Sequence, residues 1–221
     1  MKILIIRFSS IGDIVLTTPV IRCLKKQVPD AEVHFLTKIQ YADILLSNPY
    51  LDKVHLLKDN IKPLIEQLKQ EKFDYIIDLH RNIRSARVKW ALRRASSFTF
   101  NKLNWKKWLL TTFKINQMPD VHIVDRYLAT LNCFNVINDD NGLDYFIPEK
   151  DNVKEKDIPM SHQLGYIGIV IGATYNTKKL SVNKLKELCM LINYPIILIG
   201  GKEDAMVGDD LAALDIHKIY N

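Results

Sequence analysis

Short apolar runs alternate along the chain with segments in which apolar residues recur at helical spacing. Runs of this length suit strands buried on both faces of a sheet, and the helical segments suit helices packed on those faces. The alternation predicts right-handed βαβ units and therefore an α/β fold with a parallel sheet. The pattern predicts strands at 2–7, 32–37, 54–57 and 75–79, helices at 13–27, 41–47, 61–71, 82–94 and 121–134, an extended segment at 98–100 and a further helix from Trp105.

A polar, charged segment bounded by Pro148 and Pro159 is predicted to be an interdomain linker. Beyond it the pattern predicts strands at 165–171, 195–199 and 217–220, with helices at 182–192 and 203–214. An open α/β domain usually needs more strands than this second series holds. We therefore expect residues 1–160 to form one Rossmann-like domain and residues 161–221 to be the first part of an incomplete second one. Truncation is favoured over packing of these strands onto the first sheet.

Charge is ordinary overall but uneven. The 221 residues hold 31 Lys and Arg against 25 Asp and Glu, a net charge of +6. Between Asp78 and Asp120 there is no acidic residue, yet there are ten basic ones. Removing these ten leaves 21 basic against 25 acidic residues, so the rest of the chain carries −4. The basicity is therefore local and needs a local explanation.

The cysteines and histidines indicate neither a disulfide framework nor a metal-ligand spacing. The cysteines at 23, 133 and 189 lie far apart, and the six histidines are scattered. The run that Arg7 ends is too short for a signal-peptide core, and no run is long enough for a membrane span. We expect a cytoplasmic, reduced environment.

The loop after the first predicted strand carries the clearest candidate chemistry. Ligands bind beyond the carboxyl ends of strands in open α/β sheets, which is where Ser9, Ser10, Gly12 and Asp13 fall. The serines offer hydroxyls, and Gly12 permits close backbone approach. The loop has too few glycines for a dinucleotide fingerprint and lacks the Gly-Lys-Ser/Thr ending of a Walker loop. Asp13 suits either a helix N-cap or a general base, and spacing alone favours the cap.

Five stretches of the chain form an ordered set: KILIIRFSSIGDIVLTTP (2–19), DLHRNIRS (78–85), HIVDRYL (122–128), IGATYNTKK (171–179) and IGGKED (199–204). Together they cover most of the chain. In this order they resemble glycosyltransferase family 9, the lipopolysaccharide heptosyltransferases. The first stretch is the most specific, and in the second His80 replaces the family's usual Gln.

The resemblance implies a GT-B architecture, with an acceptor-binding first domain and a nucleotide-sugar-binding second domain. It implies inverting transfer of a heptose from an ADP-sugar to a lipopolysaccharide core acceptor, with no bound catalytic metal. Asp13 would then be the general base, Thr174 and Lys178 would hold the diphosphate, and Asp204 or Glu203 would meet the nucleoside. Without the resemblance, Lys178 and Lys179 suit a solvated charge pair. The family's later "DSGxxH" segment would fall beyond Asn221, so we expect much of the donor site to lie outside these residues.

Three interpretations of the basic stretch at 81–114 remain open: a solvated helical face, a nucleic-acid surface, or a surface for a phosphorylated amphiphilic acceptor at an anionic membrane. The segment NWKKWLLTTFK (104–114) favours the third, because its tryptophans recur at helical spacing beside Lys106 and Lys107. Arg81 and Arg84 follow the fourth strand and are our candidates for binding acceptor phosphates or carboxylates, although helix-surface charge explains them nearly as well.

We therefore expect a glycosyltransferase with a nucleotide-sugar donor and a lipid-linked, phosphorylated saccharide acceptor. Its expected location is cytoplasmic and peripheral at the inner face of the membrane, and nucleic acid is the less favoured partner. The alternative hypothesis is a non-catalytic module that uses residues 81–114 to bind an anionic partner.

Overall fold

The computed structural model describes residues 1–173 and 175–221. The chain forms two compact units, Met1–Pro148 and Glu149–Asn221, each described by itself below. The expected linker begins where the first unit ends. Its residues fold as short 3-10 turns, η3 (Glu149–Asp151) and η4 (Glu155–Asp157), followed by η5 (Met160–His162).

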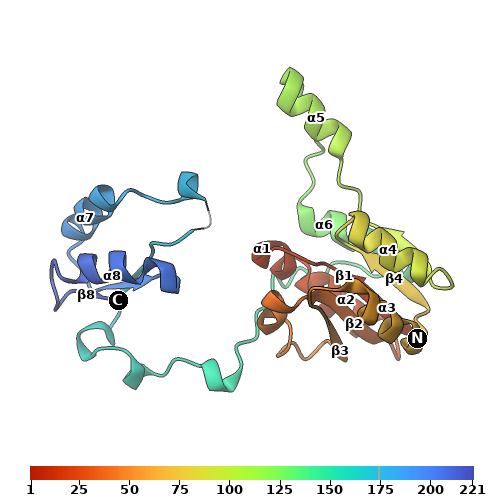
Figure 1. Cartoon of the computed structure of the whole chain (residues 1–221), viewed down its shortest axis with the longest axis horizontal. Helices are drawn as coiled ribbons and strands as arrows, with labels where there is room; N and C mark the ends of the chain where they lie inside the picture. The colour runs from red at the N-terminus through yellow and green to blue at the C-terminus, as the bar shows by residue number, and fades with distance from the viewer. Residues whose placement is uncertain (174) are drawn as a thin grey trace. The chain divides into compact units, whose positions relative to one another are not determined.

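A parallel sheet of order β3-β2-β1-β4-β5 forms the centre of unit 1 (Figure 1). Its strands are β1 (Lys2–Ile6), β2 (Glu32–Lys38), β3 (Lys53–Leu57), β4 (Tyr75–Asp78) and β5 (Ser96–Thr99). The chain first builds outward from β1 to β3 and then returns to the other side of β1 with β4. The carboxyl ends of β1 and β4 therefore meet at a topological switch point, where open α/β sheets bind ligands.

Both faces of this sheet are buried, as the apolar strands predict. Ile3 and Ile5 of β1 belong to one core cluster, and Leu4 and Ile6 belong to the other. Residues of α2 (Thr18–Gln27) and α6 (Ile123–Leu128) pack in the first cluster, and residues of α3 (Ile61–Glu71) and α4 (Ile83–Ala91) pack in the second. The remaining elements are α1 (Ile11–Val15), the 3-10 helices η1 (Ile39–Ile44) and η2 (Ala129–Phe134), and α5 (Asn104–Phe113).

Two predicted helices are each divided in the structure. The helix predicted at 13–27 consists of α1 and α2, because Pro19 has no N–H for the Val15 carbonyl. The Thr18 hydroxyl donates to that carbonyl instead, at 2.8 Å. The helix predicted at 121–134 consists of α6 followed by the tighter η2.

Unit 2 has a parallel sheet of order β6-β7-β8. Its elements are β6 (Ile167–Val170), η6 (Asn176–Lys178), α7 (Val182–Leu191), β7 (Ile196–Ile199), η7 (Lys202–Asp204), α8 (Ala205–Ala212) and β8 (Ile219–Tyr220). Leu185 and Leu211 of the two longer helices pack with Ile196, Leu198 and Ile219 of the sheet. This strand–helix alternation confirms the predicted α/β class. Among the described residues, no helix is both long and apolar enough to cross a bilayer.

Candidate functional site

The switch point of unit 1 is organised around a buried arginine, Arg7, at the end of β1. Its guanidinium donates to the carbonyl of Ser9 at 2.8 Å, the carbonyl of Leu79 at 2.6 Å and the hydroxyl of Tyr127 at 3.1 Å. A fourth contact, at 2.8 Å, joins its Nη2 to a carboxylate oxygen of Asp13. One side chain thus ties together the loop after β1, the loop after β4 and helix α6.

Asp13 lies in α1 with 40% of its side chain exposed. The backbone N–H and the hydroxyl of Ser10 both donate to its Oδ2, at 3.2 and 2.9 Å. Partial burial by itself raises the pKa of Asp13, but the bonds from Ser10 and the charge of Arg7 outweigh it, so the pKa lies below the ordinary 3.8. The prediction of Asp13 as the N-cap is wrong: Ser10 is the N-cap of α1, and Asp13, three residues later, accepts from the Ser10 backbone N–H as the second half of a capping box. Asp13 thus has this helix-end contact and also an ionised, accessible carboxylate.

The other residues predicted in this loop surround that carboxylate. Ser9 contributes its carbonyl to Arg7 and is partly exposed, whereas Ser10 and Gly12 are exposed. A Cβ built on Gly12 would meet nothing within 4 Å. The space above Gly12 is therefore open to solvent, which leaves room for a ligand beside Asp13.

A buried carboxylate, Asp78, shapes the loop after β4. Its oxygens accept from the backbone N–H groups of His80 and Arg81 at 3.0 and 2.8 Å, and from the Ser85 hydroxyl at 2.8 Å. Lys89 of α4 supplies a countercharge at 3.1 Å. Asp78 therefore holds the turn that presents His80 and Arg81 at the end of the sheet.

His80 and Lys102 extend the site. Burial, together with the charges of Arg7 and Lys102, lowers the pKa of His80 to about 4, so its ring is neutral at pH 7. Within the described part of the chain, His80 Nδ1 is buried and has no hydrogen-bond partner. Burial and the charge of Arg7 also lower the pKa of Lys102. A neutral imidazole and two cations, Arg7 and Lys102, thus lie close enough at the switch point to influence one another.

Arg81 and Arg84 are separated by the start of α4. Arg81 donates to the Asn101 side chain at 3.0 Å, and Arg126 donates to the Asn101 carbonyl at 2.6 Å. Arg84 instead lines a pocket of about 450 Å³ with Arg87. Three lysines also line this pocket: Lys38 at the end of β2, Lys58 just after β3 and Lys62 near the start of α3. Among the described residues, Asp59 is its one acidic side chain.

In unit 2, the predicted nucleotide residue Asp204 is engaged within its own unit. It pairs with Lys179 at 2.8 Å and accepts from the Gly201 N–H at 3.0 Å. A Cβ on Gly172 would lie 2.0 Å from Asp204 Oδ2. Asp204 thus ties the loop after β6 to the loop after β7, and the ion pair lowers its pKa.

The other donor-side candidates lie on the same loops. Lys178 is exposed, with its ammonium 5.9 Å from the centre of the Tyr175 ring, and Glu203 is exposed beside Asp204. Thr174 lies outside the described residues. A pocket of about 400 Å³ in this unit is lined by residues that include Gly200, Gly201 and Asp204.

Sequence reasoning missed Arg7, Tyr127 and Lys102 at the switch point. The interpretation of Lys178 and Lys179 as a solvated charge pair is wrong for Lys179, which pairs with Asp204. Arg7 gave a usable signal, because an arginine directly after a buried strand must find polar partners. Tyr127 gave no such signal, because a tyrosine at an apolar helical position suits ordinary core packing.

The comparisons with known proteins agree with this architecture. The sequence pattern described as glycosyltransferase family 9 (heptosyltransferase) matches residues 61–216. Lipopolysaccharide heptosyltransferase 1 of Campylobacter coli is 29% identical over 209 residues, which cover 87% of this chain and 60% of that protein. This chain therefore spans less than two thirds of that relative's length.

Solved structures show the same fold. The family 9 glycosyl transferase of Veillonella parvula aligns with a TM-score of 0.73 at 18% identity, over 96% of this chain and 66% of that one. The Escherichia coli heptosyltransferase WaaC with ADP aligns with a TM-score of 0.72 at 18% identity, over 100% and 74%. The chain has two units with parallel, Rossmann-like sheets, and it aligns with these structures over nearly its whole length. Its fold is therefore that of the GT-B class of glycosyltransferases.

Within that class the assignment is specific. The matched pattern covers well over half of the sequence and includes the switch-point residues after β4 and the loops of unit 2. The chain belongs to glycosyltransferase family 9, the heptosyltransferase family.

Proposed function

We propose that this chain carries the catalytic base and acceptor site of a heptosyltransferase that uses an ADP-sugar. The observation that carries the proposal is Asp13, an ionised and accessible carboxylate at the topological switch point. The family supports transfer of a heptose to a lipopolysaccharide acceptor. Bound ADP in the aligned WaaC structure supports an ADP-sugar as the donor.

In the proposed step, an acceptor hydroxyl attacks the anomeric carbon of the donor sugar. Asp13 takes the hydroxyl proton while the new carbon–oxygen bond forms. The bond between the anomeric carbon and the diphosphate breaks, and its electron pair leaves with ADP. Attack from the side opposite the leaving group inverts the anomeric configuration. Arg7 keeps Asp13 ionised before the step and orients its carboxylate.

Unit 2 is the proposed donor side. Lys178 is exposed and can neutralise charge that grows on the diphosphate, with Thr174 as its proposed partner. Glu203 is the better candidate for the nucleoside, because it is exposed whereas Asp204 already pairs with Lys179. We propose Asp204 as a residue that positions the two donor loops.

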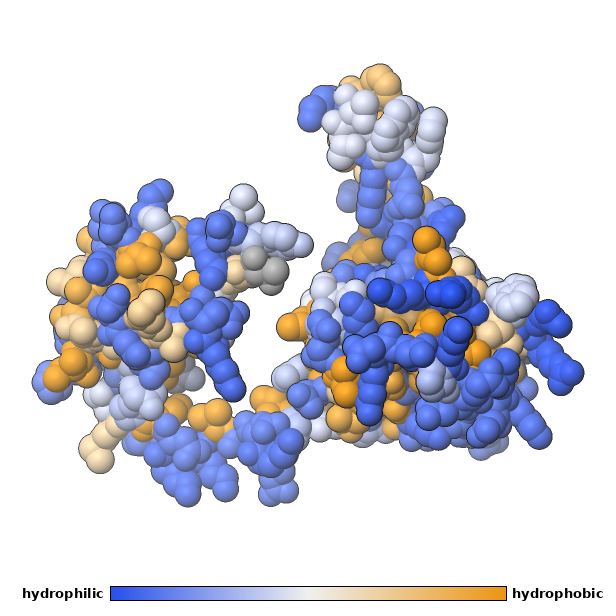
Figure 2. Space-filling view, in the orientation of Figure 1, coloured by the Kyte–Doolittle hydropathy of each residue, from blue (hydrophilic) through white to orange (hydrophobic). Residues whose placement is uncertain are grey.

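The acceptor's anionic groups have two proposed positions in unit 1. Arg81 lies beside His80 at the switch point, and Arg84 lines the basic pocket described above. In Figure 2 the part of unit 1 that carries α3 and α4 is mostly hydrophilic. Phosphates and carboxylates on a saccharide acceptor suit these guanidinium groups.

The test is a transfer assay with the full chain, ADP-heptose and a heptose-deficient lipopolysaccharide acceptor, followed by mass spectrometry of the product. Asp13→Asn keeps the side chain's shape and removes the base, so product formation should fall by about 10²–10⁴-fold. Asp43→Asn, the same change at an exposed carboxylate of η1, should leave the rate unchanged. Absence of product with the wild-type chain, or an unimpaired Asp13→Asn variant, would overturn the proposal. Acceptor binding that needs Arg81 and Arg84, with no transfer, would instead support the non-catalytic alternative.

We also propose that α5 contacts an anionic membrane surface at the cytoplasmic side, where a lipid-linked acceptor would be presented. In Figure 1, α5 stands apart from the sheet of unit 1 and its flanking helices. Trp105 and Trp108 are 68% and 45% exposed and lie beside Lys106 and Lys107. Exposed tryptophans next to lysines are typical of interfacial helices.

Vesicle sedimentation tests this contact. The chain should sediment with phosphatidylglycerol vesicles and much less with phosphatidylcholine vesicles. Joint replacement of Trp105 and Trp108 by serine should abolish sedimentation, whereas Trp90→Ser, at an exposed tryptophan of α4, should not. Tighter binding to duplex DNA than to anionic vesicles at the same salt concentration would favour nucleic acid instead.

A further inference from the structure

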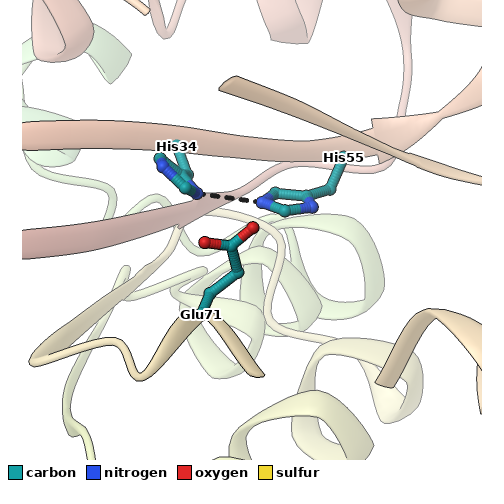
Figure 3. Close-up of side chains that lie close together, drawn as sticks. All are labelled: His34, His55 and Glu71. Carbon is teal, nitrogen blue, oxygen red and sulfur yellow. Dashed lines mark hydrogen bonds between the residues drawn. The ribbon is translucent and has the colours of Figure 1, made fainter. Parts of the chain in front are cut away.

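Two buried histidines and a glutamate meet in unit 1, away from the switch point (Figure 3). In the parallel register, Leu36 of β2 lies beside His55 of β3. His34, two residues before Leu36, therefore projects from the same face of the sheet as His55. Glu71 is the last residue of α3, which covers that face. The cluster thus lies toward the amino-terminal edge of the sheet, opposite the proposed catalytic edge.

The spacing of these side chains suits a shared ligand. His34 Nδ1 lies 3.0 Å from His55 Nε2, and one ligand atom from each of the three residues lies within 4.8 Å of the others. Two imidazole nitrogens bound tetrahedrally to zinc lie roughly 3.3 Å apart. The two rings therefore need to separate by only a few tenths of an ångström to admit the ion between them.

A carboxylate fixes the orientation of one of these rings. Glu32 Oε1 lies 2.8 Å from His34 Nε2, so that nitrogen carries the proton and donates it. The lone pair of His34 then lies on Nδ1, facing His55. A carboxylate behind a ligating histidine is the usual outer-shell arrangement at zinc sites.

We propose that His34, His55 and Glu71 form a zinc-binding site, with Glu32 as the positioning residue behind His34. Two imidazoles and a carboxylate form a donor set that zinc uses, with the fourth position left to water. The ion would join β2, β3 and the end of α3, and so would stabilise unit 1. It would take no part in the proposed transfer reaction.

Two lysines set the conditions for binding. Glu71 pairs with Lys2 at 2.9 Å and also with Lys53. The ion must displace one of these ammonium groups from the carboxylate. Lys53 is the one to move, because its side chain is 55% exposed and can turn into water, whereas Lys2 also pairs with Glu32 at 3.0 Å. Removing the Lys53 charge should therefore strengthen metal binding at this site. Metal binding by exposed histidines elsewhere would not change.

The experiment uses the full chain, freed of metal by a chelator and titrated with Co²⁺ as a visible-absorbing probe for zinc. One Co²⁺ should bind with the intense absorption of a tetrahedral site, and one equivalent of Zn²⁺ should displace it. Glu32→Gln should weaken affinity about 10- to 100-fold, and His55→Ala should weaken it further. Lys53→Met should strengthen it. His217→Ala, at an exposed histidine of unit 2, should have no effect.

Because His55→Ala can disturb the core, Glu71→Gln supplies a second ligand variant at a less buried position. Circular dichroism checks that each variant is folded, and Zn²⁺ should raise the melting temperature of the wild-type chain but not of Glu71→Gln. The proposal is overturned if folded Glu71→Gln and Glu32→Gln bind Co²⁺ as tightly as wild type. It is equally overturned if His217→Ala abolishes binding or if the bound Co²⁺ has the weak absorption of an octahedral, surface-bound ion.

Discussion

Replacement of Arg7 by methionine tests whether one buried guanidinium both stabilises unit 1 and prepares Asp13. Methionine keeps much of the apolar length of arginine and removes every donor. The carbonyl of Leu79 and the hydroxyl of Tyr127 then lose their buried partner. The carbonyl of Ser9 and the carboxylate of Asp13 also lose a donor, but both are partly exposed.

The loss of stability in Arg7→Met depends on which of these four partners water can reach. Each buried group left unpaired costs about 1–3 kcal/mol, so the two buried partners together cost about 2–6 kcal/mol. Water replaces the donor at Ser9, and the ion pair with the exposed Asp13 contributes less than about 1 kcal/mol. Domains are stable by about 5–15 kcal/mol, so unit 1 should remain folded but be markedly weakened.

Hydrogen exchange at the amides of β1 and β4, measured over a series of urea concentrations, gives the free energy of unfolding of unit 1 separately from that of unit 2. Tyr127→Phe should cost about 1 kcal/mol in wild type but should recover about 1–3 kcal/mol in the Arg7→Met background, because it removes the buried hydroxyl that the first substitution leaves unpaired. Arg94→Met, at an exposed arginine, is the matched control.

The pKa of Asp13 should rise in Arg7→Met, because the charge that favours its ionised form is gone. In the pH profile of the transfer rate, the fall in rate on the acid side should then move to higher pH. A loss of stability below about 1 kcal/mol would refute the conclusion that the substitution leaves two buried groups unpaired. An unchanged acid side of the pH profile would refute the link between Arg7 and Asp13.

Three further outcomes are expected. Asp78→Ala leaves the backbone N–H groups of His80 and Arg81 without their acceptor, whereas Ser85 and Lys89 keep their bonds to Asn82 and Thr99, so it should destabilise unit 1 by about 2–6 kcal/mol in the same exchange assay. Gly172→Ala forces its Cβ against Asp204, so it should lower the melting temperature of unit 2, whereas Gly142→Ala, at an open turn, should not act on unit 2. Hydrogen bonds from Arg22 hold the pKa of Asp139 far below its ordinary 3.8, so this stabilisation is complete above pH 3.8 and is lost as the pH falls further. Urea titrations at a series of pH values should show that loss, and Arg22→Met should flatten it.

Hydrophobic patterning predicted nearly all of the fold. The helix predicted at 61–71 is α3, and the strands of unit 1 begin and end within a residue or two of their predicted positions. These elements bury one face or both, so their periodicity carries the information. The break at Thr17 was missed, because it depends on a hydroxyl that satisfies the carbonyl freed by Pro19, and periodicity does not register such a contact.

The candidate site was predicted less completely. Asp13, Ser9 and Ser10 could be placed because they follow the first strand, where the topology requires the site. The residues that set their chemistry come from far along the chain: Tyr127 is 120 residues from Arg7, and Leu79 is 72. The histidine cluster was missed for the same reason. The sequence separates His34, His55 and Glu71, and only the register of β2 and β3 and the end of α3 bring them together.

The basic stretch shows that basic residues close together in the sequence need not form one anion-binding surface in the fold. Residues 81–114 suggested one anion-binding surface, but the fold distributes them over several. Arg81 contacts Asn101 at the switch point, Arg84 and Arg87 line the pocket beside α3, and Arg93 and Arg94 line another cavity with Trp90. Lys106 and Lys107 belong to α5. Only Arg84 and Arg87 belong to α4, and they face one pocket, whereas Arg81 precedes the helix and Arg93 and Arg94 follow it. One partner at a single site therefore cannot neutralise all of them. Charge reversals within this stretch should therefore separate acceptor affinity, for which we propose Arg81 and Arg84, from vesicle binding, for which we propose α5.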